Sequence, residues 1–403
     1  MDGFLTVGQP AAVAAVRGLL AQGSAHAVLL VGPPGVGKMR LAQDLAAALL
    51  CQRADGGIGP CRACRGCRMV EHGNHADLHL LVPTGAGGQV QIGNSDHPEP
   101  GTIRALVGDL ALLPVEGGAR VAIVRDAQAM NDDAQSALLK TLEEPPANTT
   151  LILCADDDEQ LLPTIRSRCA RVRLGTVDAR SIETLLGDRG LADPPTAARL
   201  ARLTAGRAGL AVAYAAAPEA VVIRTELVRR LLDLLAARPA ERLVAAKDLQ
   251  ARALALARLL AAPVADGAEA GVSAKGRGRS GAKPAAAAPA GDDGAEPADA
   301  DTGAGSKTTP AERRLAVRTL VELWRDLTRD IVLVERGAAT TVRDIALLEE
   351  LEAAVRTIPT GAAAVALARL MRAGELLDGN VTPELVLDTL VLRWPQRAYA
   401  GHR

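Results

Sequence analysis

Aromatic residues are nearly missing from this sequence of 403 residues, which contains one Phe, two Tyr and two Trp. The hydrophobic core must therefore be aliphatic, and the sequence is rich in Ala, Leu and Val. Proteins that bind single-stranded nucleic acids often stack the unpaired bases on clustered aromatic rings. Too few rings are present to build such a platform, so this mode of binding is excluded.

A surplus of charge and long apolar runs are also missing. The 46 Lys and Arg residues are balanced by 47 Asp and Glu residues, whereas a free-standing DNA-binding domain usually carries a basic surplus. Any contact with DNA is therefore expected to be local or shared with partners. No apolar run reaches about 18 residues without a charge, and the N-terminus lacks the basic and apolar regions of a signal peptide. We expect a cytoplasmic protein with no membrane contact.

A glycine-rich loop is the first motif that is present. Residues 32–39 read Gly-Pro-Pro-Gly-Val-Gly-Lys-Met, which matches the GxxxxGK pattern of a phosphate loop. An apolar run at 26–32 precedes it and a helical pattern at 39–50 follows it, which is the context that a true phosphate loop needs. Lys38 offers a cation to phosphate oxygens. Met39 replaces the usual Ser or Thr, and its thioether is a poor ligand for Mg²⁺. We predict a phosphate loop that holds Mg²⁺ badly.

The wider pattern predicts an α/β fold followed by helices. Apolar strand candidates at 120–124, 150–154 and 170–174 alternate with helical segments, which is typical of a parallel sheet covered on both faces. After about residue 175 the pattern is helical. Residues 263–312 interrupt it with a stretch rich in Ala, Gly, Pro and Asp that cannot bury a core. We predict a disordered insert there, either a partner-binding arm or a tolerated insertion.

A cluster of cysteines directly follows the helix after the phosphate loop. Its members are Cys51, Cys61, Cys64 and Cys67. The CxxCxxC spacing lets three thiolates converge, and a fourth ligand completes a closed tetrahedral zinc site with no position for catalysis. His72 or His75 remains an alternative to Cys51 as the fourth ligand. An iron–sulfur cluster or free thiols are further alternatives to structural zinc.

Two other positions carry phosphate chemistry. Asp126 follows the strand candidate 120–124, as the Walker B aspartate that orients Mg²⁺ does in ATPases, but Ala127 stands where a carboxylate would polarise the attacking water. Arg168, in the sequence Ser-Arg-Cys, precedes a strand candidate. A guanidinium group suits phosphate oxygens. Arg168 therefore either serves a nucleotide bound by a neighbouring subunit or forms a surface ion pair.

Several of these segments together resemble the bacterial clamp-loader family. The segments are Val7-Gly8-Gln9, the phosphate loop, the four-cysteine insert, Ala-Leu-Leu-Lys-Thr-Leu-Glu-Glu-Pro-Pro at 137–146, and Ser167-Arg168-Cys169. The resemblance extends over roughly residues 1–215 and is strongest to the non-hydrolysing stator type of subunit. It implies an AAA+ (P-loop) parallel-sheet domain at 1–173 with a zinc module at about 51–67, a small helical lid at 174–217, and an all-α collar or oligomerisation domain at 218–403.

The resemblance also implies roles for particular residues. Positions of the nucleotide site, either functional or vestigial, are Val7, Gly8, Gln9, Gly32, Gly35, Gly37, Lys38 and Asp126. Arg168 resembles an arginine finger offered to a neighbouring motor subunit. Asp156 falls at a polar sensor of the γ-phosphate, and Gly209 falls where the lid of active subunits has a sensor arginine. We therefore expect no ATPase activity of the chain itself and leave nucleotide binding without hydrolysis open.

The implied partners are the motor-type and delta subunits of a hetero-pentameric ring, and through the ring the sliding clamp and primed DNA. The ring would belong to the replicative DNA polymerase III holoenzyme. Two other functions remain in competition. One is a catalytically active, motor-type ATPase subunit of the same family, and the other is a zinc-containing regulatory nucleotide-binding module outside replication.

Overall fold

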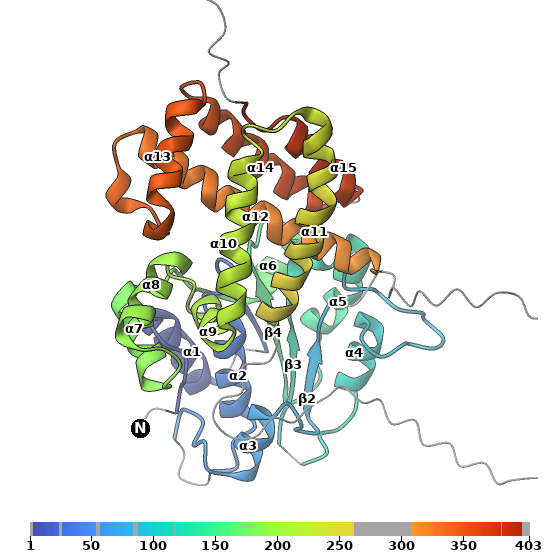
Figure 1. The fold of residues 1–403 in the computed structure, drawn as a ribbon. Helices are drawn as coiled ribbons and strands as arrows, with labels where there is room; N and C mark the ends of the chain where they lie inside the picture. Colours follow the sequence, from blue (N-terminus) through green and yellow to red (C-terminus); the bar gives the residue numbers. More distant parts are fainter. Residues whose placement is uncertain are drawn as a thin grey trace, which may run out of the picture.

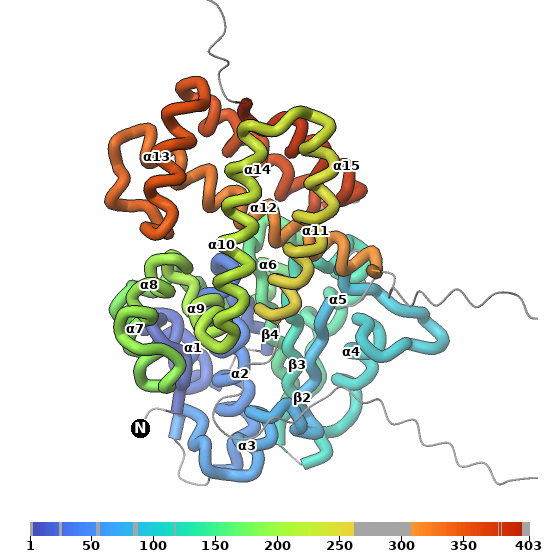
Figure 2. Tube along the Cα trace, in the orientation of Figure 1, coloured from blue at the N-terminus to red at the C-terminus, as the bar shows by residue number. Residues whose placement is uncertain are grey.

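The computed structural model describes residues 3–23, 26–53, 57–83, 88–116, 118–261, 308–379 and 381–396. We predicted a disordered insert at about 263–312, and residues 263–307 of it lie outside the described residues. The chain up to about residue 175 forms the lower half of the view in Figure 1, and the C-terminal helices form its upper half. The tube in Figure 2 shows the same division, from blue and cyan below to orange and red above.

A five-stranded sheet forms the centre of the N-terminal region. Its strands are β1 (Ala27–Val31), β2 (Leu78–Leu81), β3 (Arg120–Val124), β4 (Thr149–Ala155) and β5 (Ala170–Arg173). The strand order is β2-β3-β4-β1-β5, and every neighbouring pair is parallel. The predicted fold class, an α/β parallel-sheet P-loop domain followed by helices, is confirmed. The phosphate loop follows β1, which lies inside the sheet.

Helices cover both faces of the sheet because the strands are apolar on both sides. Val28 and Leu30 of β1 face one core, whereas Leu29 and Val31 face the other, as the alternation along a strand requires. The first face is covered by α1 (Pro10–Gln22), α2 (Lys38–Leu49) and α3 (Arg65–Glu71). The second face is covered by α4 (Ile103–Leu110), α5 (Asp132–Glu143) and α6 (Pro163–Arg168). A 3₁₀ turn, η1 (Ala127–Ala129), follows β3.

The described residues after the sheet are mostly helical and share one hydrophobic core that extends from Val177 to Trp394. Its helices are α7 (Ala179–Asp188), α8 (Pro194–Thr204), α9 (Ala208–Ala216), α10 (Pro218–Asp233), α11 (Pro239–Ala261), α12 (Pro310–Glu335), α13 (Leu348–Thr357), α14 (Ala362–Asp378) and α15 (Pro383–Leu392), with short 3₁₀ turns η2 (Ala339–Thr341) and η3 (Ile345–Leu347). Trp324 packs edge to face on Trp394 with ring centroids 4.9 Å apart. The predicted lid and collar thus share a core, and their boundaries at 173 and 217 stay predictions.

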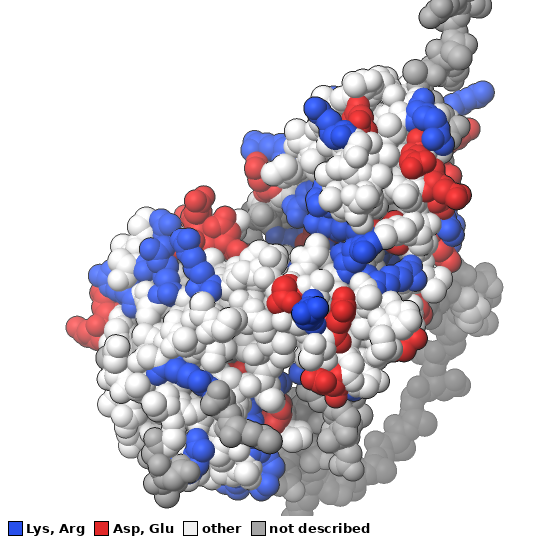
Figure 3. All heavy atoms as spheres, turned by 90° about the vertical axis from the view of Figure 1, so that its left-hand side faces the viewer, with Lys and Arg blue, Asp and Glu red and all other residues white. Residues whose placement is uncertain are grey.

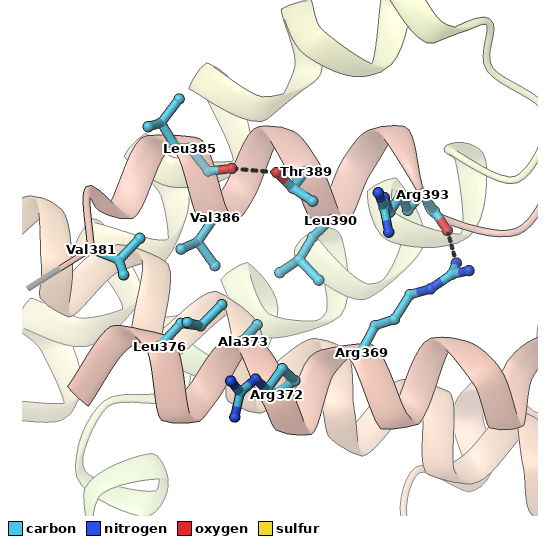
Figure 4. Close-up of a pocket in the computed structure, with 10 residues that line it drawn as sticks. All are labelled: Arg369, Arg372, Ala373, Leu376, Val381, Leu385, Val386, Thr389, Leu390 and Arg393. Atoms are coloured by element: carbon cyan, nitrogen blue, oxygen red, sulfur yellow. Dashed lines mark hydrogen bonds between the residues drawn. The ribbon is translucent and has the colours of Figure 1, made fainter. Parts of the chain in front are cut away.

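One face of the molecule is mixed in charge. Figure 3 shows Lys and Arg side chains lying beside Asp and Glu side chains over one face, with uncharged residues between them. An apolar groove of about 330 Å³ lies between α14 and α15, with aliphatic side chains such as Leu376 and Leu390 in it and Arg369, Arg372 and Arg393 around it (Figure 4). It contains none of the residues predicted from the sequence, so it lies apart from the candidate site.

None of the described helices is by itself both long and apolar enough to cross a bilayer. Two consecutive helical segments, Ile345–Thr357 and Ala362–Leu377, are together long and apolar enough, but the chain bends by 109° between them.

Candidate functional site

The loop between β1 and α2 has the tight backbone that its glycines suggest. Gly32 continues the sheet by donating its amide to the carbonyl of Ala155 at 3.2 Å. A side chain at Gly32 would place its Cβ 2.3 Å from the carbonyl oxygen of Leu174, so only glycine fits. Gly35 and Gly37 have φ angles of +79° and +105°, a region that glycine enters without strain. The loop therefore curls at the carboxyl edge of the sheet, where α/β folds hold ligands.

Lys38 points back into its own loop. Its Nζ donates to the carbonyl oxygens of Gly32 and Pro33, the second at 2.9 Å, and to Oδ1 of Asp156 at 2.7 Å. An ammonium group has three N–H donors, so these partners use all of them. The Lys38 side chain is only 8% exposed. Asp156 follows β4, and its own amide donates to Oε1 of Gln128 at 3.2 Å.

The segment at 7–9 lies beside the loop and joins it to the end of β5. The Nε2 group of Gln9 donates to the carbonyls of Val36 and Gly175, and its Oε1 accepts the amide of Gly175. Gly8 has φ +70°, and a Cβ there would lie 2.3 Å from Val177. Gly8 and Gln9 line a groove of about 510 Å³ together with Phe4 and Arg17, whereas Val7 is half-buried beside it.

Helix α9 rests on the phosphate loop. The amide of Gly209 donates to the carbonyl of Gly35 at 2.7 Å. A Cβ at Gly209 would approach that carbonyl oxygen to 3.1 Å, and one at Gly35 would lie 3.4 Å from Cβ of Arg207. Arg207 in turn donates to Oδ2 of Asp326 in α12 at 3.0 Å. The position expected for a sensor arginine is thus a backbone contact between helix and loop.

Two of the positions that the sequence analysis related to hydrolysis carry apolar side chains, and the third carries a carboxyl group just after β3. Met39 packs against the core beneath α1 and α2, and Ala127 is fully buried in the core on the other face of the sheet. Asp126 follows β3 with a left-handed backbone at φ +53°, and its Oδ2 lies 3.4 Å from Nε of Arg125. Burial raises the pKa of the Asp126 carboxyl, and Arg125 partly opposes this shift. The polar cleft beside Asp126 holds about 400 Å³ and is covered by Arg314, Arg318 and Glu322, which belong to α12.

Arg168 lies at the end of α6, immediately before β5. Its Nη2 forms an ion pair with Oε1 of Glu143 at 2.7 Å, and its Nη1 donates to the carbonyl of Thr164 at 3.1 Å. About a third of its side chain is exposed. The sheet is parallel, so the start of β5 and the loop after β1 lie at opposite edges. The structure therefore separates Arg168 from the phosphate loop of the same chain.

The four predicted cysteines come together. Their Sγ atoms all lie within 4.8 Å of one another, with Cys51 4.0 Å from Cys64 and Cys61 3.9 Å from Cys67. Tetrahedral zinc with Zn–S bonds of about 2.3 Å requires S···S separations of about 3.8 Å, so the residues fit a metal centre. The amides of Cys64 and Cys67 donate to the sulfurs of Cys61 and Cys64. Such bonds stabilise metal-bound thiolates.

The protonation of these thiols follows their surroundings. The amide of Cys64 helps to lower the pKa of Cys61 to about 6, whereas burial raises the pKa of Cys67 to about 12. For Cys64, burial opposes the shift, but the amide of Cys67 helps to leave its pKa lowered. A metal ion would compensate the buried thiolate of Cys67.

The histidines are not part of this cluster. Nδ1 of His72 contacts the carbonyl of Arg68 at 2.6 Å on the exposed side of α3. His75 is buried and accepts the amide of Asp77 at Nδ1. Within the part of the chain that is described, Cys51 is therefore the fourth member of the group.

A buried carboxylate that the sequence analysis missed ties the cysteine module to the N-terminal segment. Asp44 in α2 is fully buried and accepts the amides of Leu5 and Thr6 at 3.0 and 2.9 Å. It also pairs with Arg62, whose Nε donates to the carbonyl of Gly3 at 2.7 Å. The only signal in the sequence was an aspartate among the apolar positions of a helix.

Part of the chain is similar in sequence to known proteins. Residues 8–178 match a family model described as DNA polymerase III, delta subunit. The chain is 41% identical over 147 residues to DNA polymerase III subunit delta' of Pseudomonas aeruginosa, which covers 36% of this chain and 42% of that protein. It is 34% identical over 179 residues to the subunit delta' of Bacillus subtilis, with 44% and 50% covered.

Part of the chain is similar in sequence to the DNA polymerase III delta' subunits. The resemblance predicted from the sequence is thereby confirmed. The chain spans about half the length of the curated relatives that it matches. Among solved structures, a gamma subunit-related protein of Thermotoga maritima aligns with 93% of this chain and 97% of its own, at 16% identity and a TM-score of 0.38. Residues 8–178, which match the family model, contain the phosphate loop, the four cysteines of the cluster and Arg168.

Proposed function

We propose that the chain is a non-hydrolysing delta' stator subunit of the replicative clamp loader. In this role it helps the ATP-dependent loading of the sliding clamp onto primed DNA, and it offers Arg168 to the ATP site of the neighbouring motor-type subunit. The proposed partners are motor-type and delta subunits in a hetero-pentameric ring, with the helices after residue 217 contributing collar contacts. The chain would thus be a component of the DNA polymerase III holoenzyme without its own ATPase activity.

The observation that carries this proposal is the separation of Arg168 from the phosphate loop. Val28 pairs with Ala170 and Val31 with Arg173, so α6 enters the sheet at the edge opposite to the loop. Three residues of strand correspond to about 10 Å. A guanidinium there cannot serve its own loop, but its partial exposure leaves it accessible to phosphates on another subunit.

The changes around the chain's own loop support the lack of hydrolysis. Met39 offers no hard ligand to Mg²⁺, and the buried methyl of Ala127 cannot activate water. The loss of a base or of a charge-stabilising group costs a factor on the order of 10²–10⁵ in rate. Several such losses in one site would leave very little turnover, even though they are not additive.

We further propose that the four-cysteine centre holds structural zinc. The four sulfurs offer no open position, and thiolates favour zinc over harder ions. Bound zinc would supply no catalysis here. It would fix the loop between α2 and α3, and through Arg62 and Asp44 it would hold the N-terminal segment.

The decisive experiment measures ATP hydrolysis at the neighbouring site of the reconstituted loader. With motor-type and delta subunits, clamp and primed DNA, the Arg168→Ala variant should assemble normally but slow single-turnover hydrolysis at that site by a factor on the order of 10³ or more. Arg173→Ala removes an exposed arginine of β5 and serves as the matched control. Unchanged hydrolysis with Arg168→Ala would contradict the proposal that Arg168 acts as an arginine finger.

The same preparations test the two other functions. Steady ATP turnover by the isolated chain, abolished by Lys38→Ala, would identify a motor-type ATPase instead. Failure to assemble with motor-type subunits would favour a regulatory module outside replication.

A further inference from the structure

The phosphate loop of this chain already binds an anion that belongs to the chain itself. Asp156 lies 2.7 Å from Nζ of Lys38, and the two residues are 118 positions apart in sequence. The remaining donors of Lys38 go to carbonyl oxygens of the loop. We infer that the Asp156 carboxylate occupies the place of a phosphate oxygen and closes this loop to nucleoside triphosphates.

The position of Asp156 is fixed by the sheet and not by a mobile loop. Val31 pairs with Ala155 in the register of β1 and β4, so the residues that follow the two strands emerge side by side. Gly32 is bonded to Ala155, and Gln128 accepts the amide of Asp156. The lysine and the carboxylate are therefore brought together by backbone pairing, and their contact requires no ordering of long segments.

The helices above the loop reinforce this closure. Gly209 donates to Gly35, so the first turn of α9 lies directly on the loop. Arg207 at the start of α9 is held by Asp326 of α12, and Asp326 also pairs with Arg343. All three contacts are intramolecular, and the two ion pairs connect the start of α9 and the segment between η2 and η3 to α12. The chain thus keeps a closed arrangement without any help from a nucleotide.

Electrostatics favour the exclusion of nucleoside triphosphates from this loop. A triphosphate would have to displace the Asp156 carboxylate from Lys38, whose side chain is 8% exposed, and it would bring several negative charges next to Asp156, whose side chain is 33% exposed. Lys38 would exchange one anionic partner for another, whereas Asp156 would lose its cation and be left beside the like charge of the phosphates. Because Lys38 and the glycines are retained, the absence of hydrolysis would not by itself prevent binding. The closure is thus a separate property from the hydrolytic losses and from the proposed role of Arg168.

The test is equilibrium binding of ATP and ADP to the isolated full chain by calorimetry, with and without Mg²⁺. The wild-type chain should show no saturable binding up to about 1 mM, a weak-binding limit. Asp156→Asn keeps the shape but removes the charge, and it should tighten binding at least ten-fold. Adding Lys38→Ala to that variant should abolish the gain. Asp157→Asn, an exposed neighbour that accepts the amide of Glu159, is the control and should behave as wild type.

Two results would overturn the inference. One is wild-type binding within two-fold of the Asp156→Asn variant, and the other is no gain of binding in that variant although its circular dichroism shows a folded chain. A second readout needs no nucleotide. In urea unfolding, Lys38→Met and Asp156→Asn should be non-additive, as two partners of one contact are. Additive effects would show that the two residues do not act together. Neither readout involves Arg168, so the outcome is separable from that of the proposed function.

Discussion

Arg168 is paired with Glu143, and the two side chains come from neighbouring helices on one face of the sheet, with Nη2 and Oε1 2.7 Å apart. Both are partly exposed, at 35% and 51%. Exposed ion pairs contribute only about 0–1 kcal/mol to stability. Glu143 therefore orients the guanidinium without binding it firmly, and under the proposed function a phosphate of the neighbouring subunit would replace the carboxylate at little cost.

From this pair follows a first prediction about stability. Arg168→Ala and Glu143→Gln should each change the free energy of unfolding of the isolated chain by less than about 1 kcal/mol. Urea titration followed by circular dichroism measures this. A much larger loss with Arg168→Ala would mean that the residue has a structural role, and any loss of ATP turnover in the assembly could then not be assigned to a finger.

The cysteine centre gives a second prediction. The purified chain should contain one zinc ion, and Cys64→Ser or a strong chelator should release it and lower the Tm by roughly 5–10 °C, because metal binding and folding are coupled. Cys169→Ala removes a thiol outside the cluster and should retain the metal. Elemental analysis and thermal unfolding provide both readouts. A chain that is fully stable and free of metal would contradict a structural zinc site.

The buried carboxylate of Asp77 gives a prediction about pH. Asp77 is 1% exposed and accepts the amides of Val115 and Glu116 at 2.7 and 3.0 Å. Burial opposes ionisation, but these amides and the charge of Arg120 leave the pKa of Asp77 below its usual value. A depressed pKa stabilises the fold above the unfolded-state pKa of about 4, and that stability is lost as the pH falls through the folded value.

The Asp77→Asn variant should therefore be less stable than wild type at pH 7, and the difference should shrink as the pH falls below about 4. Urea unfolding at a series of pH values measures it, with the exposed Asp188→Asn as a control for general charge effects. A difference that is constant or grows toward acid pH would show that ionised Asp77 is not stabilising.

A fourth prediction concerns the C-terminal helices. Arg242 of α11 is fully buried, and its guanidinium donates to the carbonyl oxygens of Ala237, Val391, Trp394 and Pro395. Arg242→Met would leave these acceptors without donors and should cost about 2–4 kcal/mol in chemical unfolding. Arg238→Met, at an exposed position, should cost much less. Equal effects of the two variants would disprove the anchoring role.

Much of the sheet could be predicted, because most of its strands are short apolar runs that can be recognised from neighbouring residues alone. The prediction for 120–124 agrees with β3, and those for 150–154 and 170–174 differ from β4 and β5 by at most one residue at each end. Asn131 caps α5, since its side chain accepts the amide of Ala134. Strand β2 was missed, because four residues at the edge of a sheet with Leu80 half exposed have no distinctive pattern.

Long-range pairings could not be predicted from the sequence. The resemblance implied that Asp156 falls at a sensor of the γ-phosphate, but its hydrogen bond with Lys38 was not predicted, because that contact depends on the register of β1 with β4. The contact of Gly209 with Gly35 depends in the same way on how α9 packs. The spacing of the cysteines suggested that three of them converge. Only the structure shows that Cys51, and not His72 or His75, is the fourth residue of the cluster.

The parallel sheet gives the domain a polarity, with a cradle for anions at one edge and a guanidinium at the other. If copies of such a domain stand in a row, each one can offer its guanidinium to the phosphate loop of the next, always in the same direction. Under the proposed function, a subunit whose phosphate loop is occupied by its own carboxylate has no use for an arginine from the preceding subunit. Such a subunit would stand at the end of the row, and a ring that includes it would have a gap on that side.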